Sequence, residues 1–182
     1  MMSFESLSEA LLADASDASS GIPGMFAPIV GSWVLDFSGR SLEGTEAQAT
    51  GAMTMGAVLG GRALQDVWWM PDPDPSRPPL FHGTTVRFYD PAIDAWRSTW
   101  IEPVHGRAIT FIGRRVDDDI VLESTNSDPA LRWVFAHISA ESFTWIGSQR
   151  RETESDWETY VLMQAHRPPA PAEGASGSGG GL

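Results

Sequence analysis

Residues 86–100 read VRFYDPAIDAWRSTW and have the pattern of a β-hairpin. Two runs rich in aromatic and β-branched residues flank segment 90–94, where aspartate and proline favour a turn for separate backbone reasons. In the second run Trp96, Ser98 and Trp100 recur with period two, so their side chains share one face of a strand. Similar units precede and follow this one. The sequence therefore predicts a meander of antiparallel strands.

Working outward, strand-length segments recur at near-even spacing along the chain, as in antiparallel barrels and sandwiches. Ten strands are predicted, at residues 31–39, 48–57, 62–70, 80–89, 95–101, 106–115, 120–124, 131–138, 142–150 and 157–167. Segment 71–79 contains five prolines, so we expect an exposed loop at a barrel mouth. Sequential hairpins without a long crossover favour an up-and-down barrel over a sandwich, because closure removes the sheet edges.

The strand region is flanked by two segments of different composition. Residues 1–24 are expected to form a short helix, at 3–13, followed by a linker, and residues 168–182 a disordered tail of Pro, Ala, Gly and Ser. The barrel is assigned to residues 25–167. The apolar segment 22–30, interrupted by two prolines, suits a helical turn that plugs one end. The predicted fold is all-β, a barrel of about ten strands with a short N-terminal helix.

Composition narrows the possible partners. A net charge of −12 argues against nucleic acid or an anionic membrane as the main partner, since binding to either requires positive potential on the protein surface. The chain has neither cysteine nor lysine, which excludes thiolate metal sites, cysteine nucleophiles and lysine Schiff bases. It shows no secretion signal and no membrane-spanning apolar run. We therefore expect a cytoplasmic monomer or homodimer.

The start of the first strand, Gly31-Ser32-Trp33, resembles the Gly-x-Trp motif of lipocalin and calycin barrels. The resemblance implies that Trp33 closes the barrel floor and that an arginine packs over it, either Arg167 or Arg150. Further segments are similar to a family of uncharacterised bacterial lipocalin-like proteins, at residues 58–62, 88–91 with 96, 106–107 with 111–113, and 143–145 with 157. This resemblance covers residues 25–167. It implies a fold but no reaction, because the family has no assigned catalytic residues to carry over.

The chain has eight tryptophans, and a closed ten-stranded barrel is too wide for side chains to fill. We therefore expect a cavity that holds a flat or hydrophobic ligand. The predicted ligand-binding residues are Trp96, Trp100, Phe111, Trp133, Phe135, Trp145, Arg132 and His137. The alternative is that the rings pack the core and the outer face. Several strands are apolar on both faces, so the pattern leaves open which face points inward.

The polar candidates also have alternatives. Arg132, like Arg87 and Arg97, lies in an apolar strand, where it either points to solvent, pairs with a carboxylate such as Glu123 or Glu158, or anchors an anionic ligand head group. His137 has the strand parity of the predicted cavity rings, and its alternative is a structural histidine.

The chain lacks a Gly-x-Ser-x-Gly motif, a phosphate loop and the histidine spacing of a metal site. The candidate residues leave three functional hypotheses. The first is intracellular binding of a small hydrophobic or aromatic molecule. The second is a barrel-chamber enzyme, a cyclase, isomerase or hydratase of a hydrophobic biosynthetic intermediate, with Arg132, His137 and Tyr160 as candidates. The third is heme binding through His166 or His137, and the weaker similarity to the ten-stranded nitrobindin barrels implies His166 as the iron ligand. Otherwise no cofactor and no metal are expected, and the sequence leaves open whether the protein is an enzyme.

Overall fold

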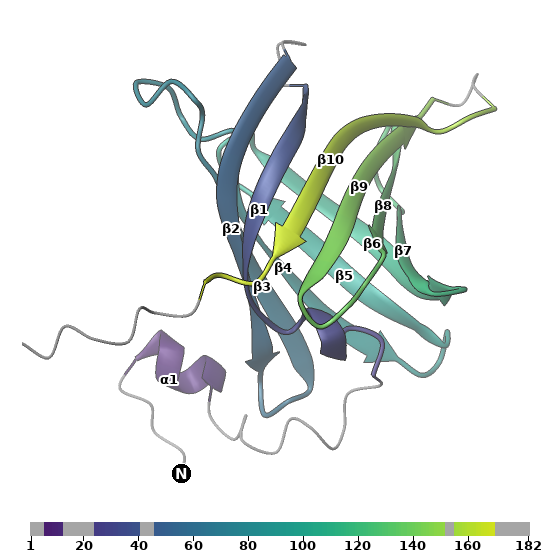
Figure 1. Ribbon diagram of the computed structural model, residues 1–182. Coiled ribbons are helices and arrows are strands. Elements are labelled where there is room, and N and C mark those ends of the chain that lie inside the picture. The colour runs from purple at the N-terminus through teal and green to yellow at the C-terminus, as the bar shows by residue number, and fades with distance from the viewer. Residues whose placement is uncertain (1–5, 13–23, 41–45, 152–154, 170–182) are drawn as a thin grey trace, which may run out of the picture.

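The computed structural model describes residues 6–12, 24–40, 46–151 and 155–169. Ten antiparallel strands form one closed barrel, each paired with its neighbours in sequence, and the first strand closes the ring by pairing with the last (Figure 1). The elements are α1 (Leu7–Leu12), the 3-10 helix η2 (Ala27–Ile29), β1 (Gly31–Arg40), β2 (Glu46–Val58), β3 (Ala63–Met70), β4 (Phe81–Asp90), β5 (Ala95–Glu102), β6 (Arg107–Val116), β7 (Asp119–Ser124), β8 (Ala130–Ala136), β9 (Ser142–Arg150) and β10 (Glu158–His166). The predicted all-β up-and-down barrel is confirmed. No helix among these residues is long and apolar enough to cross a membrane.

Differences from the predicted boundaries are local. The helix expected at 3–13 is described only as α1, whose Leu11 carbonyl accepts a hydrogen bond from the Leu59 amide in the β2–β3 turn. The eighth strand ends at Ala136 and not at 138, because His137 has a positive φ of 52° and turns the chain. The expected linker at 14–21 and most of the expected tail lie outside the described residues.

One end of the barrel is closed by η2 and the residues around it, at the bottom of Figure 1. Phe26 and Ile29 are fully buried there, and the Trp33 indole donates a hydrogen bond to the Ile29 carbonyl at 2.8 Å. The Arg167 guanidinium lies over the Trp33 ring, 3.6 Å from its centroid. Arg167, and not Arg150, therefore packs over the floor tryptophan. Arg150 stacks on Trp157 instead.

The other end is surrounded by the long connections between strands. The proline-rich β3–β4 loop and the β5–β6 and β7–β8 connections contribute residues to the mouth of one internal cavity, together with the adjoining ends of β9 and β10. The expected exposed loop at residues 71–79 therefore does lie at the mouth. Within the described part of the chain the barrel is open at this end, and η2 plugs the opposite one.

Candidate ligand cavity

The barrel encloses a cavity of about 750 Å³ that reaches from the mouth toward the plug. Its wall combines apolar and polar residues, and rings are contributed by Phe37, Trp68, Phe81, Trp100, Trp133, Phe135 and Trp145. The strands present these rings because inward positions alternate with outward ones along each strand. In β3, for example, Trp68 is 5% exposed and points inward, whereas Trp69 is 46% exposed on the outside. A space of this size and lining accommodates an organic molecule of the size of a typical drug.

The structure places four of the six predicted aromatic residues in the cavity wall, namely Trp100, Trp133, Phe135 and Trp145. The other two are buried behind the wall. Phe111 packs against Trp133 with ring centroids 4.1 Å apart, and Trp96 packs edge-to-face on the plug residue Phe26 at 5.0 Å. Phe111 and Trp96 thus support the lining and the floor without being part of the cavity surface.

Trp68 lines the cavity but is absent from the predicted set. The sequence has two adjacent tryptophans at 68 and 69, and either could face inward in isolation. The pairing of β3 decides between them, since Trp68 lies opposite Met53 and Gly83 on its two neighbours. In the strand pairing, Trp33 of β1 lies opposite Met53, which lies opposite Trp68. Following the inward face from the predicted first strand in this way would have identified Trp68 as the inward residue.

Tyr160 also reaches the cavity, because of an irregularity in β10. The register between β9 and β10 shifts between Thr159 and Val161, which makes Tyr160 the extra residue of a bulge. Its hydroxyl accepts a hydrogen bond from the Trp133 indole at 3.0 Å. Burial raises the pKa of Tyr160, and the Trp133 hydrogen bond and Arg107 oppose this change. The hydroxyl is therefore protonated at neutral pH and can donate to a ligand.

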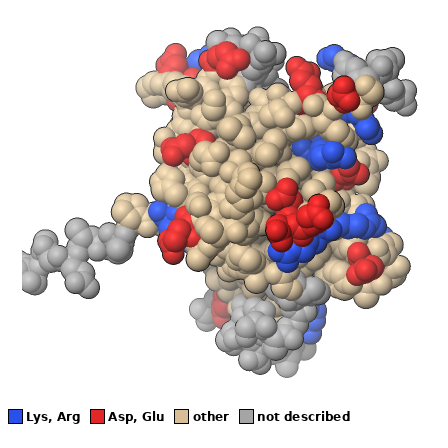
Figure 2. Space-filling model, turned by 45° about the vertical axis from the view of Figure 1, so that its right-hand side comes forward, with Lys and Arg blue, Asp and Glu red and all other residues tan. Residues whose placement is uncertain are grey.

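Arg132 and His137 lie outside the cavity. Arg132 points outward from β8, forms an ion pair with Glu123 and stacks on Trp157 at 4.2 Å, so the carboxylate-pairing alternative holds for it. Figure 2, which brings this side of the barrel forward, shows acidic and basic side chains next to one another. His137 is exposed, because β8 ends before it and the period-two pattern no longer applies.

The histidine proposed as a heme ligand points away from the barrel interior. His166 alternates with the buried Ala165 at the end of β10, and its Nδ1 lies 3.6 Å from an Asp36 carboxylate oxygen on the outer surface. The imidazole that does line the cavity is His105 at the mouth, and its Nδ1 lies 2.8 Å from the Glu102 carboxylate. Among the described residues no three His, Asp or Glu side chains gather as a metal ion would require.

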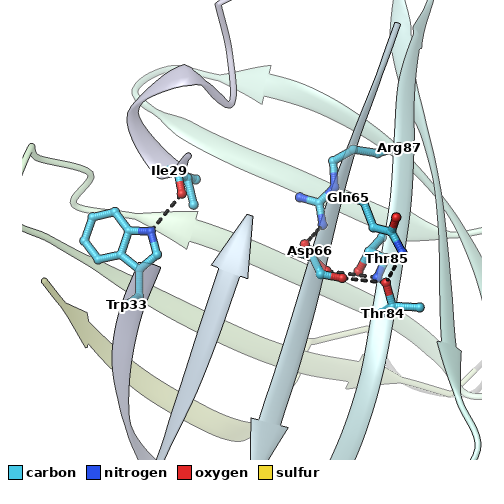
Figure 3. A network of polar contacts seen from close by, with 7 residues as sticks. All are labelled: Ile29, Trp33, Gln65, Asp66, Thr84, Thr85 and Arg87. Atoms are coloured by element: carbon cyan, nitrogen blue, oxygen red, sulfur yellow. Dashed lines mark hydrogen bonds and ion pairs between the residues drawn. The ribbon is translucent and has the colours of Figure 1, made fainter. Parts of the chain in front are cut away.

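A buried polar cluster lies on β3, β4 and β5 and contains Asp66, Thr85, Arg87 and Ser98. Figure 3 shows the first three of these residues. Arg87 forms an ion pair with Asp66, which also accepts the Thr85 backbone N–H at 2.9 Å. The Arg87 guanidinium additionally lies 4.6 Å from the Phe26 ring centroid. Both Thr85 and Arg87 line the cavity. Burial lowers the pKa of Arg87, and the Asp66 charge opposes this change.

The closed barrel, its cavity and the arginine-capped floor tryptophan together give the chain a lipocalin-like barrel fold. Two solved structures share this fold. Rv2717c from M. tuberculosis matches with a TM-score of 0.60 and 15% identity, over 81% of this chain and 99% of that one. The S-type phycobiliprotein lyase CPES from Guillardia theta matches with a TM-score of 0.56 and 12% identity, over 80% of this chain and 92% of that one. The chain matches no protein-family model, and no curated protein is significantly similar to it in sequence.

Proposed function

We propose that this protein binds a small hydrophobic or aromatic molecule inside its barrel. The observation that carries this proposal is a cavity of about 750 Å³, open at one end, plugged at the other and with several indole and phenyl rings in its wall. Such a lining favours a flat apolar ligand, because rings supply a large contact area and their faces stack. The cytoplasmic location, the monomeric or homodimeric state and the lack of nucleic-acid and membrane partners stay predictions.

The adjacent tryptophans of β3 provide a matched test. N-phenyl-1-naphthylamine is a neutral aromatic probe whose fluorescence rises in an apolar site. We expect Trp68→Leu to weaken its binding about tenfold, the effect of losing roughly 1.4 kcal/mol of aromatic contact. Trp69→Leu removes an exposed indole from the outer face and should leave the affinity unchanged. Equal effects of the two variants, or no binding by the wild type, would contradict the proposal.

Native mass spectrometry then addresses the natural ligand. Protein purified gently from its own host should carry a non-covalent adduct that is lost on denaturation. The Trp68→Leu variant, purified in the same way, should carry less of that adduct than Trp69→Leu. If the wild type, Trp68→Leu and Trp69→Leu all show no adduct, the result counts against a tightly held ligand.

A second candidate function is an enzyme that uses the barrel as a chamber. Two observations favour it. Tyr160 is the one residue of the predicted catalytic set that reaches the cavity, where its protonated hydroxyl can orient or polarise a substrate. A protein with a similar fold is also named a phycobiliprotein lyase. The test compares a molecule captured by the wild type with the same molecule captured by the Tyr160→Phe variant. If the wild type releases it chemically altered and the variant releases it unaltered, the chamber is catalytic.

A further inference from the structure

A glutamate and a histidine lie together at the cavity mouth, where β5 ends and the β5–β6 connection begins. Both Glu102 and His105 line the cavity, and the His105 Nδ1 lies 2.8 Å from the Glu102 carboxylate. The same carboxylate accepts the backbone N–H groups of Val104 at 2.8 Å and of His105 at 3.2 Å. Glu102 is only 1% exposed, so these donors satisfy a buried acceptor. The two backbone hydrogen bonds hold the turn, and the imidazole is additional to them.

The carboxylate determines which ring nitrogen of His105 carries the proton. An ionised carboxylate only accepts hydrogen bonds, so Nδ1 donates to Glu102. A neutral imidazole has one N–H group, and its other nitrogen is then an acceptor. The hydrogen bond to a carboxylate polarises the ring and strengthens that acceptor. Nε2 of His105 is therefore a hydrogen-bond acceptor in the wall of the mouth.

This acceptor is accessible to a molecule in the cavity. No described residue donates a hydrogen bond to Nε2, and the His105 side chain is 24% exposed. In the described part of the chain, the buried side-chain nitrogens and oxygens without a partner belong to Arg87 and Ser98. Nε2 is not one of these buried atoms. A ligand can thus reach Nε2 without any rearrangement of the protein.

The aromatic wall extends to this position. Trp100 and Glu102 occupy alternate positions on the inward face of β5, so their side chains are neighbours along the strand. Trp100 also packs edge-to-face on Trp133, with ring centroids 5.9 Å apart, and both indoles line the cavity. An aromatic molecule that packs on these rings has its outer edge at the mouth, within reach of His105.

The charges at the mouth oppose the reverse arrangement, in which a protonated His105 donates to an anionic ligand. The residues that line the mouth and its approach include more carboxylates than arginines, namely Asp72, Glu102, Asp128 and Glu158 against Arg77 and Arg107. The resulting potential disfavours an anion at this place. A ligand group that donates a hydrogen bond is compatible with both the charge and the imidazole.

We propose that the ligand is an aromatic molecule with an O–H or N–H donor at the end nearest the mouth, as in a phenol, an enol or an aromatic amine. This group donates to Nε2 of His105 in place of water. Glu102 acts through His105 as a positioning residue, and the aromatic body lies among the rings of the wall. This inference rests on the proposed function and specifies the ligand class for the same cavity.

Three naphthalenes that differ in one substituent test the inference. 2-Naphthol has an O–H donor, 2-methoxynaphthalene keeps the oxygen without a donor, and 2-acetylnaphthalene has a carbonyl acceptor. Their affinities are measured by isothermal titration calorimetry at pH 8, where an ordinary imidazole is neutral. We expect the wild type to bind 2-naphthol about three- to tenfold more tightly than 2-methoxynaphthalene, the order of effect of one hydrogen bond. Equal affinities, or tighter binding of 2-methoxynaphthalene, would overturn the inference.

A pair of histidine variants connects this preference to the residue. His105→Phe keeps a planar ring but removes Nε2, and the backbone hydrogen bonds to Glu102 do not need the imidazole. The preference for 2-naphthol should fall by the same three- to tenfold. His82→Phe makes the same substitution at an exposed position on the outer face of β4 and should leave the preference unchanged. Equal preferences in the two variants would mean that His105 is not the acceptor.

Nuclear magnetic resonance of the wild type provides a measurement that does not depend on the folding of His105→Phe. In protein labelled with ¹⁵N-histidine, the His105 signals are identified as those missing from a His105→Gln variant. Addition of 2-naphthol should shift the Nε2 resonance of His105, because this nitrogen gains a hydrogen bond, and 2-methoxynaphthalene should not. An Nε2 resonance that stays unchanged at saturation with 2-naphthol would overturn the inference.

The outcomes separate the two proposals. A preference for 2-acetylnaphthalene over 2-methoxynaphthalene that disappears in His105→Phe would mean that His105 donates, and it would overturn the inference. In that case, binding of any of the three naphthalenes or of the naphthylamine probe leaves the proposed function standing. If the wild type binds none of these compounds, the proposed function and the inference both fail.

Discussion

Arg167 joins parts of the chain that are far apart in sequence. Besides stacking on Trp33, its guanidinium donates to the carbonyls of Val30 and Ala140, each at 3.1 Å. These contacts connect the plug, the start of β1 and the β8–β9 connection at the closed end. A planar guanidinium can make stacked and hydrogen-bonded contacts simultaneously, whereas an ammonium group cannot.

We predict that Arg167→Ala lowers the free energy of unfolding by about 2–3 kcal/mol, because it loses charged hydrogen bonds and a cation–π contact. Urea denaturation followed by tryptophan fluorescence measures this change. Arg167→Lys should lie between the wild type and Arg167→Ala. Arg150→Ala is the control, since Arg150 is exposed and stacks only on Trp157, and we expect a loss below about 1 kcal/mol. Similar losses for both alanine variants would contradict the assigned role of Arg167.

Glycines within the strands make room for the cavity tryptophans. A Cβ on Gly83 in β4 would lie 2.6 Å from ring atoms of Trp100 and 2.6 Å from the Ile101 carbonyl oxygen. A Cβ on Gly147 in β9 would lie 2.9 Å from the ring of Trp145. The rings therefore lie against the wall of the barrel at these positions, which leaves the interior free for a ligand.

Gly83→Ala should push Trp100 into the cavity and destabilise the fold by about 1–3 kcal/mol, as overpacking does. Near-UV circular dichroism reports the indole environment, and the affinity for the naphthylamine probe should fall. Gly56→Ala in β2 is the matched control, because among the described residues no atom beyond its own chain neighbours lies within 4 Å of the added Cβ. If the two substitutions have the same effect on probe binding, the close packing on Gly83 is not what keeps the cavity open.

The hairpin of β4 and β5 is held at its turn by Asp90. The carboxylate accepts hydrogen bonds from Arg97 Nε at 2.6 Å and from the Ala92 backbone N–H at 3.0 Å. The Arg97 hydrogen bond, followed by that of Ala92, lowers the pKa of Asp90. The folded protein therefore binds this proton less readily than the unfolded chain does.

This difference predicts an acid-dependent contribution to stability. It is fully present above the ordinary aspartate pKa of about 4 and is lost as the pH falls through the lower folded-state value. Asp90→Asn cannot titrate and lacks this part of the acid dependence. Urea denaturation between pH 6 and pH 3 should show a shallower loss of stability for the variant. Parallel curves for the two proteins would mean that Asp90 does not contribute.

The molecule as a whole is strongly acidic, and the acidic excess extends to the cavity mouth. The net charge is −12, and four carboxylates and two arginines line the entrance and its approach. An anionic ligand therefore enters against the potential of the protein, whereas a neutral ligand does not.

Salt should consequently distinguish the two ligand types. Raising NaCl from 10 to 300 mM shortens the screening length from about 30 Å to well below 10 Å. We expect the affinity for 2-naphthoate to increase several-fold and that for 2-acetylnaphthalene to change by less than about twofold. Calorimetric titrations at the two salt concentrations measure both. An affinity for 2-naphthoate that falls with salt would indicate attraction by a positive group and contradict the charge argument.

Local patterns in the sequence were sufficient to predict the strands, the turns between them and the order of the hairpins. Turn-forming residues and period-two alternation act over a few positions, so they are visible without a partner strand. The Gly-x-Trp resemblance similarly indicated the closed end, where Trp33 and Arg167 do meet. Most of the aromatic wall follows from the same alternation.

The positions that distinguish this cavity depend on contacts between strands and on breaks in the alternation. Tyr160 enters through a bulge, His137 leaves through a turn, and Trp68 rather than Trp69 faces inward because of the register of β3. Arg87 shows the same dependence most clearly. In the sequence it is one of several arginines in apolar strands, and its role becomes visible only where β3 brings Asp66 beside it. Which charge is neutralised, and which donors stay free, is a property of residues distant in sequence that only the closed sheet brings together.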